Sequence, residues 1–296
     1  MRVLVTGGTG LVGRYIVEEL LAAGYEVTVA GRRAPANHLF SSPVGFRRLS
    51  LDAEDHPEAL LEGITSLVHA AFDHVPGRYR GGEGDDPEAF RRRNLDGSVR
   101  LIAAARRSGL RRAVLLSSRA VYDGIPAGIP LTEAADLAPS SLYGEIKLGC
   151  ERAFSALNGP DFTTASLRLT GVYGDLKPNK WDGLIADYLA GRPVPLRAGS
   201  EVHGRDAGRA VRLMLEADAA RVGGESFNAS DLITDTHDIL FFVKQVRECP
   251  HPLPHRAETA AVAAMECGKI RALGWVPGGA ALFADTVTRL AGYHRD

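Results

Sequence analysis

The stretch Arg2-Val3-Leu4-Val5-Thr6-Gly7-Gly8-Thr9-Gly10-Leu11-Val12-Gly13 opens the chain and predicts a strand, a glycine turn and a helix. Val3 to Val5 is a short apolar run typical of a buried strand, and the apolar residues from Leu11 to Leu21 recur at helical spacing. Such a turn aims backbone N–H groups and the positive end of the helix dipole at one point. The turn is therefore predicted to bind the pyrophosphate of a dinucleotide.

The composition limits the classes of protein to which the chain can belong. Its 296 residues suffice for one large α/β domain with an elaboration, or for two unequal lobes. A net charge of −1 gives no sign of a nucleic-acid or acidic-membrane partner, and no stretch approaches a membrane span. The three cysteines form no Cys-x-x-Cys pair and fit a reducing compartment. We therefore expect a cytoplasmic protein with a small-molecule partner, no nucleic acid, no membrane and no metal site.

The end of the second predicted strand bears on the choice of cofactor. Glu26 to Ala30 predicts a strand that runs into Gly31-Arg32-Arg33. A dinucleotide fold usually places an Asp or Glu at this position to bind the adenosine ribose. Gly31 leaves room there, and the two arginines supply charge that can hold a 2′-phosphate, which favours NADP over NAD. The alternative is that Arg32 and Arg33 are an ordinary solvated pair.

Two further strands bring small and polar residues to the same edge of the predicted sheet. A third strand, 46–51, ends at Asp52, and a fourth, 64–68, ends at His69-Ala70-Ala71. The small side chains of Ala70 and Ala71 let a cofactor lie against the backbone. The glycine-rich, polar segment 72–86 is predicted to be a loop on the substrate side, and residues 87–108 a long helix.

A tyrosine and a lysine one helical turn apart indicate acid–base chemistry. The fifth predicted strand, 113–116, delivers Ser117 and Ser118 to the same edge, and the helix predicted over 140–157 carries Tyr143 and Lys147. A nearby ammonium favours the phenolate and lowers a pKa that otherwise lies near ~10. Tyrosine then becomes usable as an acid or a base at neutral pH. The alternative is an incidental pair on a helix surface.

The second half of the chain carries weaker patterns. They predict a sixth strand over 165–169, a loop over 170–178, a short strand over 225–228, helices near 181–190, 206–216, 235–247 and 257–273, and a closing segment over 279–291. We expect residues 1–174, rejoined by about 200–230, to form an NAD(P)-binding domain. Residues 175–296 are expected to form a smaller substrate-binding lobe.

Taken in this order, the motifs resemble the extended short-chain dehydrogenase/reductase family of the NAD-dependent epimerase/dehydratase type. The likeness runs nearly end to end. It rests on the glycine turn, Asp52, His69-Ala70-Ala71, Asn94 to Ser98, Ser117 to Tyr122, Tyr143 to Lys147, Leu167-Arg168, Val172-Tyr173-Gly174, His203, Asp206, Phe227-Asn228 and Leu273 to Pro277. The resemblance implies an α/β fold, a Rossmann-type doubly wound parallel sheet with a smaller C-terminal substrate lobe.

The resemblance also implies roles for individual residues. Tyr143 would be the catalytic acid/base, Lys147 would lower its pKa and hold the nicotinamide ribose, and Ser118 would polarise the substrate carbonyl. Asn94 would join this catalytic set, and Asp52 would lie at the adenine. With Arg32 and Arg33, the predicted cofactor site comprises Gly7, Gly10, Leu11, Val12, Gly13, Asp52, Ala70, Ala71, Tyr143 and Lys147; the predicted substrate residues are Arg119, Tyr173 and His203. The helices over 87–108 and 140–157 imply a homodimer.

Departures from the family pattern favour one reaction over the others. Sugar-nucleotide dehydratases of this family follow the active hydroxyl with an Asp-Glu pair, and Arg119 and Ala120 stand here instead. Gly171 and Gly199 replace an Asn and an Arg that lie near the diphosphate in relatives that bind nucleotide sugars. We therefore expect hydride transfer on a small carbonyl or alcohol, with a sugar or sugar acid among the candidates.

The function of the chain and the role of Arg119 both keep alternatives at this point. The chain could be a nucleotide-sugar epimerase or 4-reductase, or, in another class, a non-catalytic nucleotide-sensing protein on the same fold. Arg119 could pair with a substrate carboxylate or could serve as an internal ion-pair arginine.

Overall fold

A seven-stranded parallel sheet forms the centre of the molecule, in the order β3-β2-β1-β4-β5-β6-β9. The computed structural model describes residues 1–52, 57–75, 82–177 and 179–293. The strands are β1 (Arg2–Thr6), β2 (Glu26–Gly31), β3 (Gly45–Arg48), β4 (Ser66–His69), β5 (Arg112–Ser118), β6 (Thr163–Leu169) and β9 (Glu225–Ala229). The strand order reverses at β1, which pairs with both β2 and β4. The predicted Rossmann-type doubly wound sheet is thereby confirmed.

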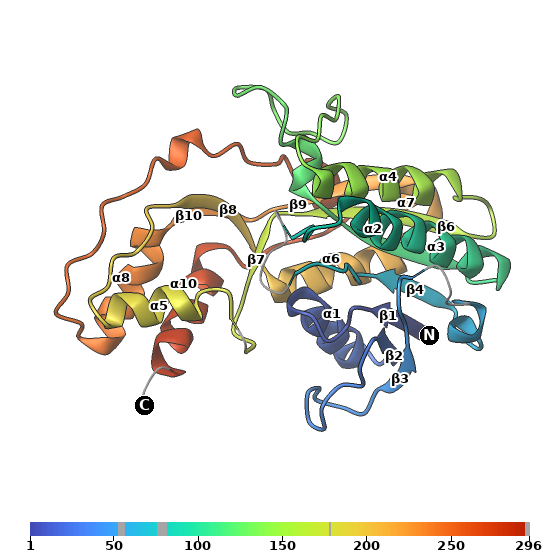
Figure 1. Cartoon of the computed structure of the whole chain (residues 1–296), viewed down its shortest axis with the longest axis horizontal. Coiled ribbons are helices and arrows are strands. Elements are labelled where there is room, and N and C mark those ends of the chain that lie inside the picture. The colour runs from blue at the N-terminus through green and yellow to red at the C-terminus, as the bar shows by residue number, and fades with distance from the viewer. Residues whose placement is uncertain (53–56, 76–81, 178, 294–296) are drawn as a thin grey trace.

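Helices cover both faces of this sheet (Figure 1). Successive residues of a strand point to opposite faces, so Val3 and Val5 face one layer and Leu4 the other. The first layer contains α1 (Leu11–Ala22) and α6 (Gly204–Glu216), and the second contains α3 (Gly97–Arg107) and α4 (Leu142–Ala156). The apolar cores of the two layers hold the carboxyl ends of the strands at one edge of the sheet.

A smaller three-stranded sheet lies beside the large one, at the left of Figure 1. Its strands are β7 (Gly171–Tyr173), β8 (Ala198–His203) and β10 (Leu232–Asp235); β7 is parallel to β8, and β10 is antiparallel to it. Three helices surround it, α5 (Asp182–Leu189), α8 (Thr236–Arg247) and α10 (Gly279–Tyr293). Their shared core is built around the rings of Tyr173, Trp181 and Phe283.

The long helix predicted over 87–108 is interrupted in the structure. It consists of α2 (Pro87–Arg91), a π-helical turn η2 (Arg92–Asp96) and then α3. Other short elements are η1 (Pro57–Leu61), η3 (Arg119–Tyr122) and α7 (Ala219–Val222). The π turn widens the backbone ladder at Asn94, a residue that the sequence placed in the catalytic set.

Two expectations for the second half of the chain were wrong, and two strands were not predicted. The predicted loop over 170–178 contains strand β7, and β8 and β10 were missed. The helix predicted over 257–273 is mainly extended chain with two short helical turns, η4 (Thr259–Ala261) and α9 (Gly268–Arg271). Its alanine-rich sequence favours helix, but Met265 forms a bridge with Leu131 and the Glu266 carbonyl accepts a hydrogen bond from Asn228. These tertiary contacts outweigh the local preference.

Tyr15 joins α1 to the chain that leaves β7 of the smaller sheet. A Cβ at Gly174 would lie 2.0 Å from the Tyr15 hydroxyl oxygen, and one at Gly204 would lie 2.1 Å from its ring. The Tyr15 hydroxyl accepts from the Leu176 N–H at 2.8 Å and donates to Asp175 at 3.3 Å. Burial raises the pKa of Tyr15, so the hydroxyl keeps the proton that it donates.

Two general features bear on the expectations from composition. Within the described ranges, no helix combines the length and the apolar character needed to span a bilayer. Cys150, Cys249 and Cys267 are buried free thiols.

Candidate active site

The glycine turn between β1 and α1 has the geometry of an anion-binding cradle. Gly7 has a φ of +69°, and a Cβ there would lie 2.7 Å from the Ala71 nitrogen. A Cβ at Gly13 would lie 2.1 Å from the Gly7 carbonyl oxygen. Gly10 stands at the N-cap without a side chain, so the N–H groups of the first turn of α1 remain directed toward this edge. The turn therefore fits the pyrophosphate of a dinucleotide.

The residues predicted at the adenosine end lie on the same edge. Gly31 ends β2, and the side chains of Arg32 and Arg33 that follow it are exposed. Arg32 donates a hydrogen bond to Asp73 at 2.9 Å. Asp52 is exposed and accepts a hydrogen bond from the Ser50 hydroxyl at 2.7 Å.

His69 is a buried, neutral link in a hydrogen-bond chain. The Ser98 hydroxyl donates to the Asn94 carbonyl at 2.5 Å, so Ser98 accepts from His69 Nε2 at 2.8 Å. His69 Nδ1 then accepts from the Thr6 hydroxyl, also at 2.8 Å. Burial, assisted by the charge of Lys147, lowers the pKa of His69 to about 3. His69 therefore fixes the end of β4 next to β1 and carries no charge at neutral pH.

Asn94 holds the chain that leaves β4. Its side chain is fully buried in the π turn, where it accepts from the Asp73 N–H at 2.6 Å and donates to the Asp73 carbonyl at 2.8 Å. A further hydrogen bond from Asn94 reaches the Phe90 carbonyl at 3.0 Å. In this structure Asn94 thus positions the backbone at Asp73.

Lys147 is a buried ammonium on α4. Its Nζ donates to the Leu116 carbonyl at 2.8 Å and lies 4.5 Å from the centre of the Phe72 ring and 5.8 Å from that of Tyr143. The Phe72 and Tyr143 rings meet edge to face at 5.0 Å. Burial lowers the pKa of Lys147 to about 8, which leaves it mainly charged at neutral pH. The structure therefore brings the predicted tyrosine and lysine together around one aromatic ring.

The two serines at the end of β5 have different partners. Ser117 donates to the buried carboxylate of Glu151, which also pairs with Arg168 at 2.7 Å. The Ser118 hydroxyl oxygen instead accepts from the Ala120 N–H at 3.2 Å, so its own proton is left to donate. Of these two serines, only Ser118 is half-exposed. Among the described residues, no acceptor for the Ser118 hydroxyl proton is found.

The first turn of α4 packs directly against the turn that carries Ser118. A Cβ at Gly144 would lie 2.6 Å from the Ala120 carbonyl oxygen, so glycine is needed for this approach. Tyr143 precedes Gly144, and Ser118 lies two residues before Ala120. The segments that carry Ser118, Tyr143 and Lys147 therefore pack against each other at the carboxyl edge of the sheet.

The three residues predicted to contact substrate have other partners in the structure. Arg119 pairs with Asp123 at 3.1 Å and donates to the Ala263 carbonyl at 3.0 Å, contacts that a substrate carboxylate would have to displace. Tyr173 and His203 are fully buried, with ring centres 4.9 Å apart. Burial lowers the pKa of His203 to about 4 and raises that of Tyr173.

A carboxylate occupies the space beside Gly171. Leu169 on β6 is the register partner of Ser118 on β5. Gly171 lies two residues after Leu169. A Cβ at Gly171 would be 2.6 Å from the Glu201 carboxylate, and the side chain of Glu201 is nearly buried. Lys180 forms an ion pair with this carboxylate. The glycine at position 171 therefore leaves room for the Glu201 carboxylate.

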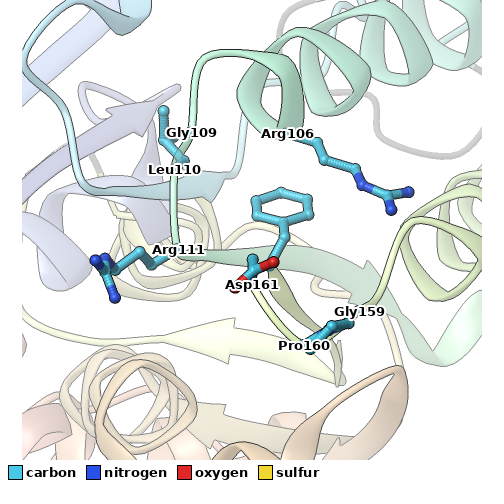
Figure 2. Close-up of a pocket in the computed structure, with 8 residues that line it drawn as sticks. Arg106, Gly109, Leu110, Arg111, Gly159, Pro160 and Asp161 are labelled. Carbon is cyan, nitrogen blue, oxygen red and sulfur yellow. The ribbon is translucent and has the colours of Figure 1, made fainter.

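A separate pocket of about 340 Å³ lies away from these residues (Figure 2). Gly109, Leu110 and Arg111 before β5, and Gly159 to Phe162 before β6, line it together with Arg106. These segments lie at the amino ends of the strands, opposite the edge that carries Ser118. The described part of the chain also shows no group of three or more His, Cys, Asp and Glu side chains arranged to hold a metal.

Phe72 and Asp73 were not singled out by the sequence analysis. They belong to the segment 72–86 that was predicted to be a loop, of which residues 76–81 lie outside the described part of the chain. A signal was present in the sequence, because an aromatic ring and a carboxylate follow directly after His69-Ala70-Ala71, at the carboxyl end of a parallel strand.

The sheet order, the glycine cradle and the Ser118–Tyr143–Lys147 grouping define a dinucleotide-binding enzyme of the Rossmann class. The comparison with family models gives the narrower assignment. Residues 3–230 match the model of the NAD dependent epimerase/dehydratase family, and the chain belongs to that family. The family resemblance drawn from the motifs is thereby confirmed.

Individual relatives have varied activities. The UDP-glucose 4-epimerase of Corynebacterium glutamicum is 29% identical over 186 residues, which are 61% of this chain and 55% of that protein. Human sterol-4-alpha-carboxylate 3-dehydrogenase, decarboxylating, is 28% identical over 185 residues, 60% of this chain and 46% of that protein. The chain thus spans about half the length of these curated relatives.

Among solved structures, the UDP-glucose 4-epimerase of Thermus thermophilus in complex with NAD superposes with a TM-score of 0.80. It is 26% identical, and the superposition covers 100% of this chain and 99% of that one.

We predict that Lys147→Met raises the free energy of unfolding at pH 7. A pKa lowered from 10.5 to about 8 corresponds to ~3 kcal/mol against the buried charge. Loss of the hydrogen bond to Leu116 offsets part of this, so a net gain of ~1 to 2 kcal/mol is expected in urea unfolding.

The pH dependence provides the control for this variant. The folded-state pKa lies below the unfolded one, so the unfolded chain binds more protons between pH 8 and 10.5. The wild type therefore gains stability over this window relative to Lys147→Met, and the difference between them shrinks. If the difference in free energy of unfolding between the two proteins stayed constant from pH 7 to pH 10.5, the lowered pKa of Lys147 would be contradicted.

Proposed function

We propose that this protein is an NAD(P)-dependent oxidoreductase that transfers a hydride to or from a small carbonyl or alcohol. Sugars and sugar acids are among the candidate substrates. The observation that carries the proposal is the buried Lys147 ammonium beside Tyr143, with Ser118 two residues beyond the carbonyl that holds it. A buried charge is unfavourable for folding, so its retention at a cofactor edge supports a chemical role.

The proposed mechanism assigns one task to each side chain. The bound nicotinamide supplies or accepts the hydride. Ser118 donates a hydrogen bond to the substrate oxygen, while one of its own lone pairs accepts from the Ala120 N–H. Tyr143 moves a proton to or from the same oxygen, and the Lys147 ammonium favours the phenolate form of Tyr143.

The substrate side supports a small substrate. The Glu201 carboxylate beside Gly171 would repel a diphosphate that came near Ser118, although its pairing with Lys180 reduces the repulsion. We further propose that the chain after residue 174, apart from about 200–230, binds the substrate, while the earlier part with 200–230 binds the dinucleotide.

A second candidate function is 4-epimerisation of a nucleotide sugar. The relatives in Corynebacterium glutamicum and Thermus thermophilus favour it, since both are UDP-glucose 4-epimerases. A panel of sugars, sugar acids and nucleotide sugars distinguishes the two functions. Hydride transfer to a small substrate changes the amount of reduced cofactor, whereas epimerisation interconverts two nucleotide sugars with no net change. Turnover of nucleotide sugars alone would replace the first proposal with the second.

We predict that Tyr143→Phe lowers turnover by about two to four orders of magnitude and leaves cofactor affinity close to normal. Only the proton-transfer hydroxyl is removed, while the pyrophosphate cradle lies in the glycine turn before α1. Steady-state rates and a cofactor titration measure the two effects. Ser117→Ala is the matched control at the substrate edge, since its hydroxyl is bound to Glu151. Substantial activity of Tyr143→Phe would remove Tyr143 from the mechanism.

We propose NADP over NAD as the preferred cofactor, because Gly31 places no carboxylate at the ribose and Arg32 and Arg33 follow it. The expected result is tighter binding of NADPH than NADH, with Arg32→Ala reducing the difference and Gly31→Asp reversing it. Fluorescence titration of both reduced cofactors measures this preference, which should weaken as salt rises. Equal affinities, or tighter NADH, would mean that the arginines do not engage the 2′-phosphate.

We also propose a homodimer in which α3 and α4 pack against the same helices of a second copy. Half-exposed Val99 and Ala103 on α3 and Ala153 on α4 would contribute to this interface. Sedimentation at micromolar concentration is expected to give the mass of two chains. A single-chain mass under those conditions would contradict this assembly.

A further inference from the structure

Asp73 connects the adenosine end of the cofactor edge with the residues around Lys147. One oxygen of its carboxylate accepts from Arg32 at 2.9 Å, and the other lies 2.7 Å from Arg93 Nε. The Asp73 side chain is 25% exposed, whereas that of Arg32 is 75% exposed. Asp73 is therefore the more buried member of the pair, and the exposed Arg32 side chain extends to it.

The backbone at Asp73 is held independently of its carboxylate. Asn94 binds both the N–H and the carbonyl of Asp73, at 2.6 Å and 2.8 Å. The preceding ring, Phe72, packs against Tyr143 and lies 4.5 Å from the Lys147 ammonium. Replacing the Asp73 carboxylate by an amide of the same shape therefore leaves the chain in place.

The strand order explains why Asp73 meets Arg32. Strand β4 lies next to β1, and β1 lies next to β2. The chain that leaves β4 passes the glycine turn so closely that a Cβ at Gly7 would lie 2.7 Å from the Ala71 nitrogen. Two residues later Asp73 reaches the arginine that follows β2. A phosphate held by Arg32 would therefore meet the Asp73 carboxylate at close range.

We infer that Asp73 is a specificity-determining residue for the cofactor: it engages Arg32 and so weakens the binding of a dinucleotide that carries a 2′-phosphate. The inference rests on the proposed NAD(P) site. A 2′-phosphate must displace Asp73 from Arg32 and is repelled by the same carboxylate, whereas NADH brings no charge to this place. The preference for NADPH is thereby smaller than the two arginines alone would give.

Asp73→Asn tests the inference by titration of NADH and NADPH, followed by fluorescence. The variant is expected to bind NADPH about threefold to tenfold more tightly than the wild type, with a change of less than about twofold for NADH. Glu88→Gln is the matched control, because Glu88 is an exposed carboxylate on the neighbouring α2 that pairs with Arg92 at 3.9 Å. This control should change neither affinity.

A second substitution separates an effect through Arg32 from a general one. In an Arg32→Ala background, Asp73→Asn should produce a smaller gain in NADPH affinity, because the part that comes from releasing Arg32 is gone and only the relief of direct repulsion remains. If Asp73→Asn leaves the ratio of NADPH affinity to NADH affinity unchanged, or weakens both affinities equally, the inference is overturned. The proposed cofactor site is not contradicted by that result. Failure of the wild type to bind either cofactor overturns the proposed function together with it. Asp73→Ser gives the same readout should the asparagine variant fail to fold.

Discussion

The buried ammonium of Lys147 is the interaction on which the arrangement of the cofactor edge depends. A charge in this position is unfavourable, and its pKa falls to about 8. The Leu116 carbonyl and the face of Phe72 stabilise it. These contacts tie α4 to β5 and to the chain after β4, so the helix that carries Tyr143 is held against the strand that delivers Ser118. His69, packed nearby, stays neutral and adds no second charge.

Sequence patterns predicted the large sheet well because its signals are local. The apolar runs of β1 and β2 and the glycines between β1 and α1 decide their structure within a few residues. The smaller sheet was missed for the opposite reason. Strands β7, β8 and β10 are short, and they become strands only by pairing with segments far along the chain. The alanine-rich segment near Met265 was predicted to be helical, although its bridge to Leu131 holds it extended.

The candidate site was predictable in its residue types and less so in its contacts. Helical spacing alone placed Tyr143 and Lys147 on one face of α4, and strand position brought Ser118 to the edge. No local pattern could tell that Ser117 would be bound by Glu151 while Ser118 keeps its proton, since that depends on a residue of α4 that lies 34 positions further along the chain. The hydrogen bonds between Asn94 and the Asp73 backbone likewise depend on a π turn. The residue spacing of an ordinary α-helix does not predict such a turn.

Tyr15 has a consequence for how such proteins can be recombined. Its ring, on the helix that follows the glycine turn, fills the space left by Gly174 and Gly204, and its hydroxyl binds the backbone at Leu176. A chimera that grafts the smaller sheet of a relative onto this large sheet would need a glycine at position 174 of the graft and would have to keep Gly204 at the start of α6. If either glycine were replaced by a larger residue, its side chain would collide with Tyr15 on α1 and shift the smaller sheet relative to the large one. The chain between the two sheets is therefore a poor crossover point unless Tyr15, Gly174 and Gly204 are inherited together.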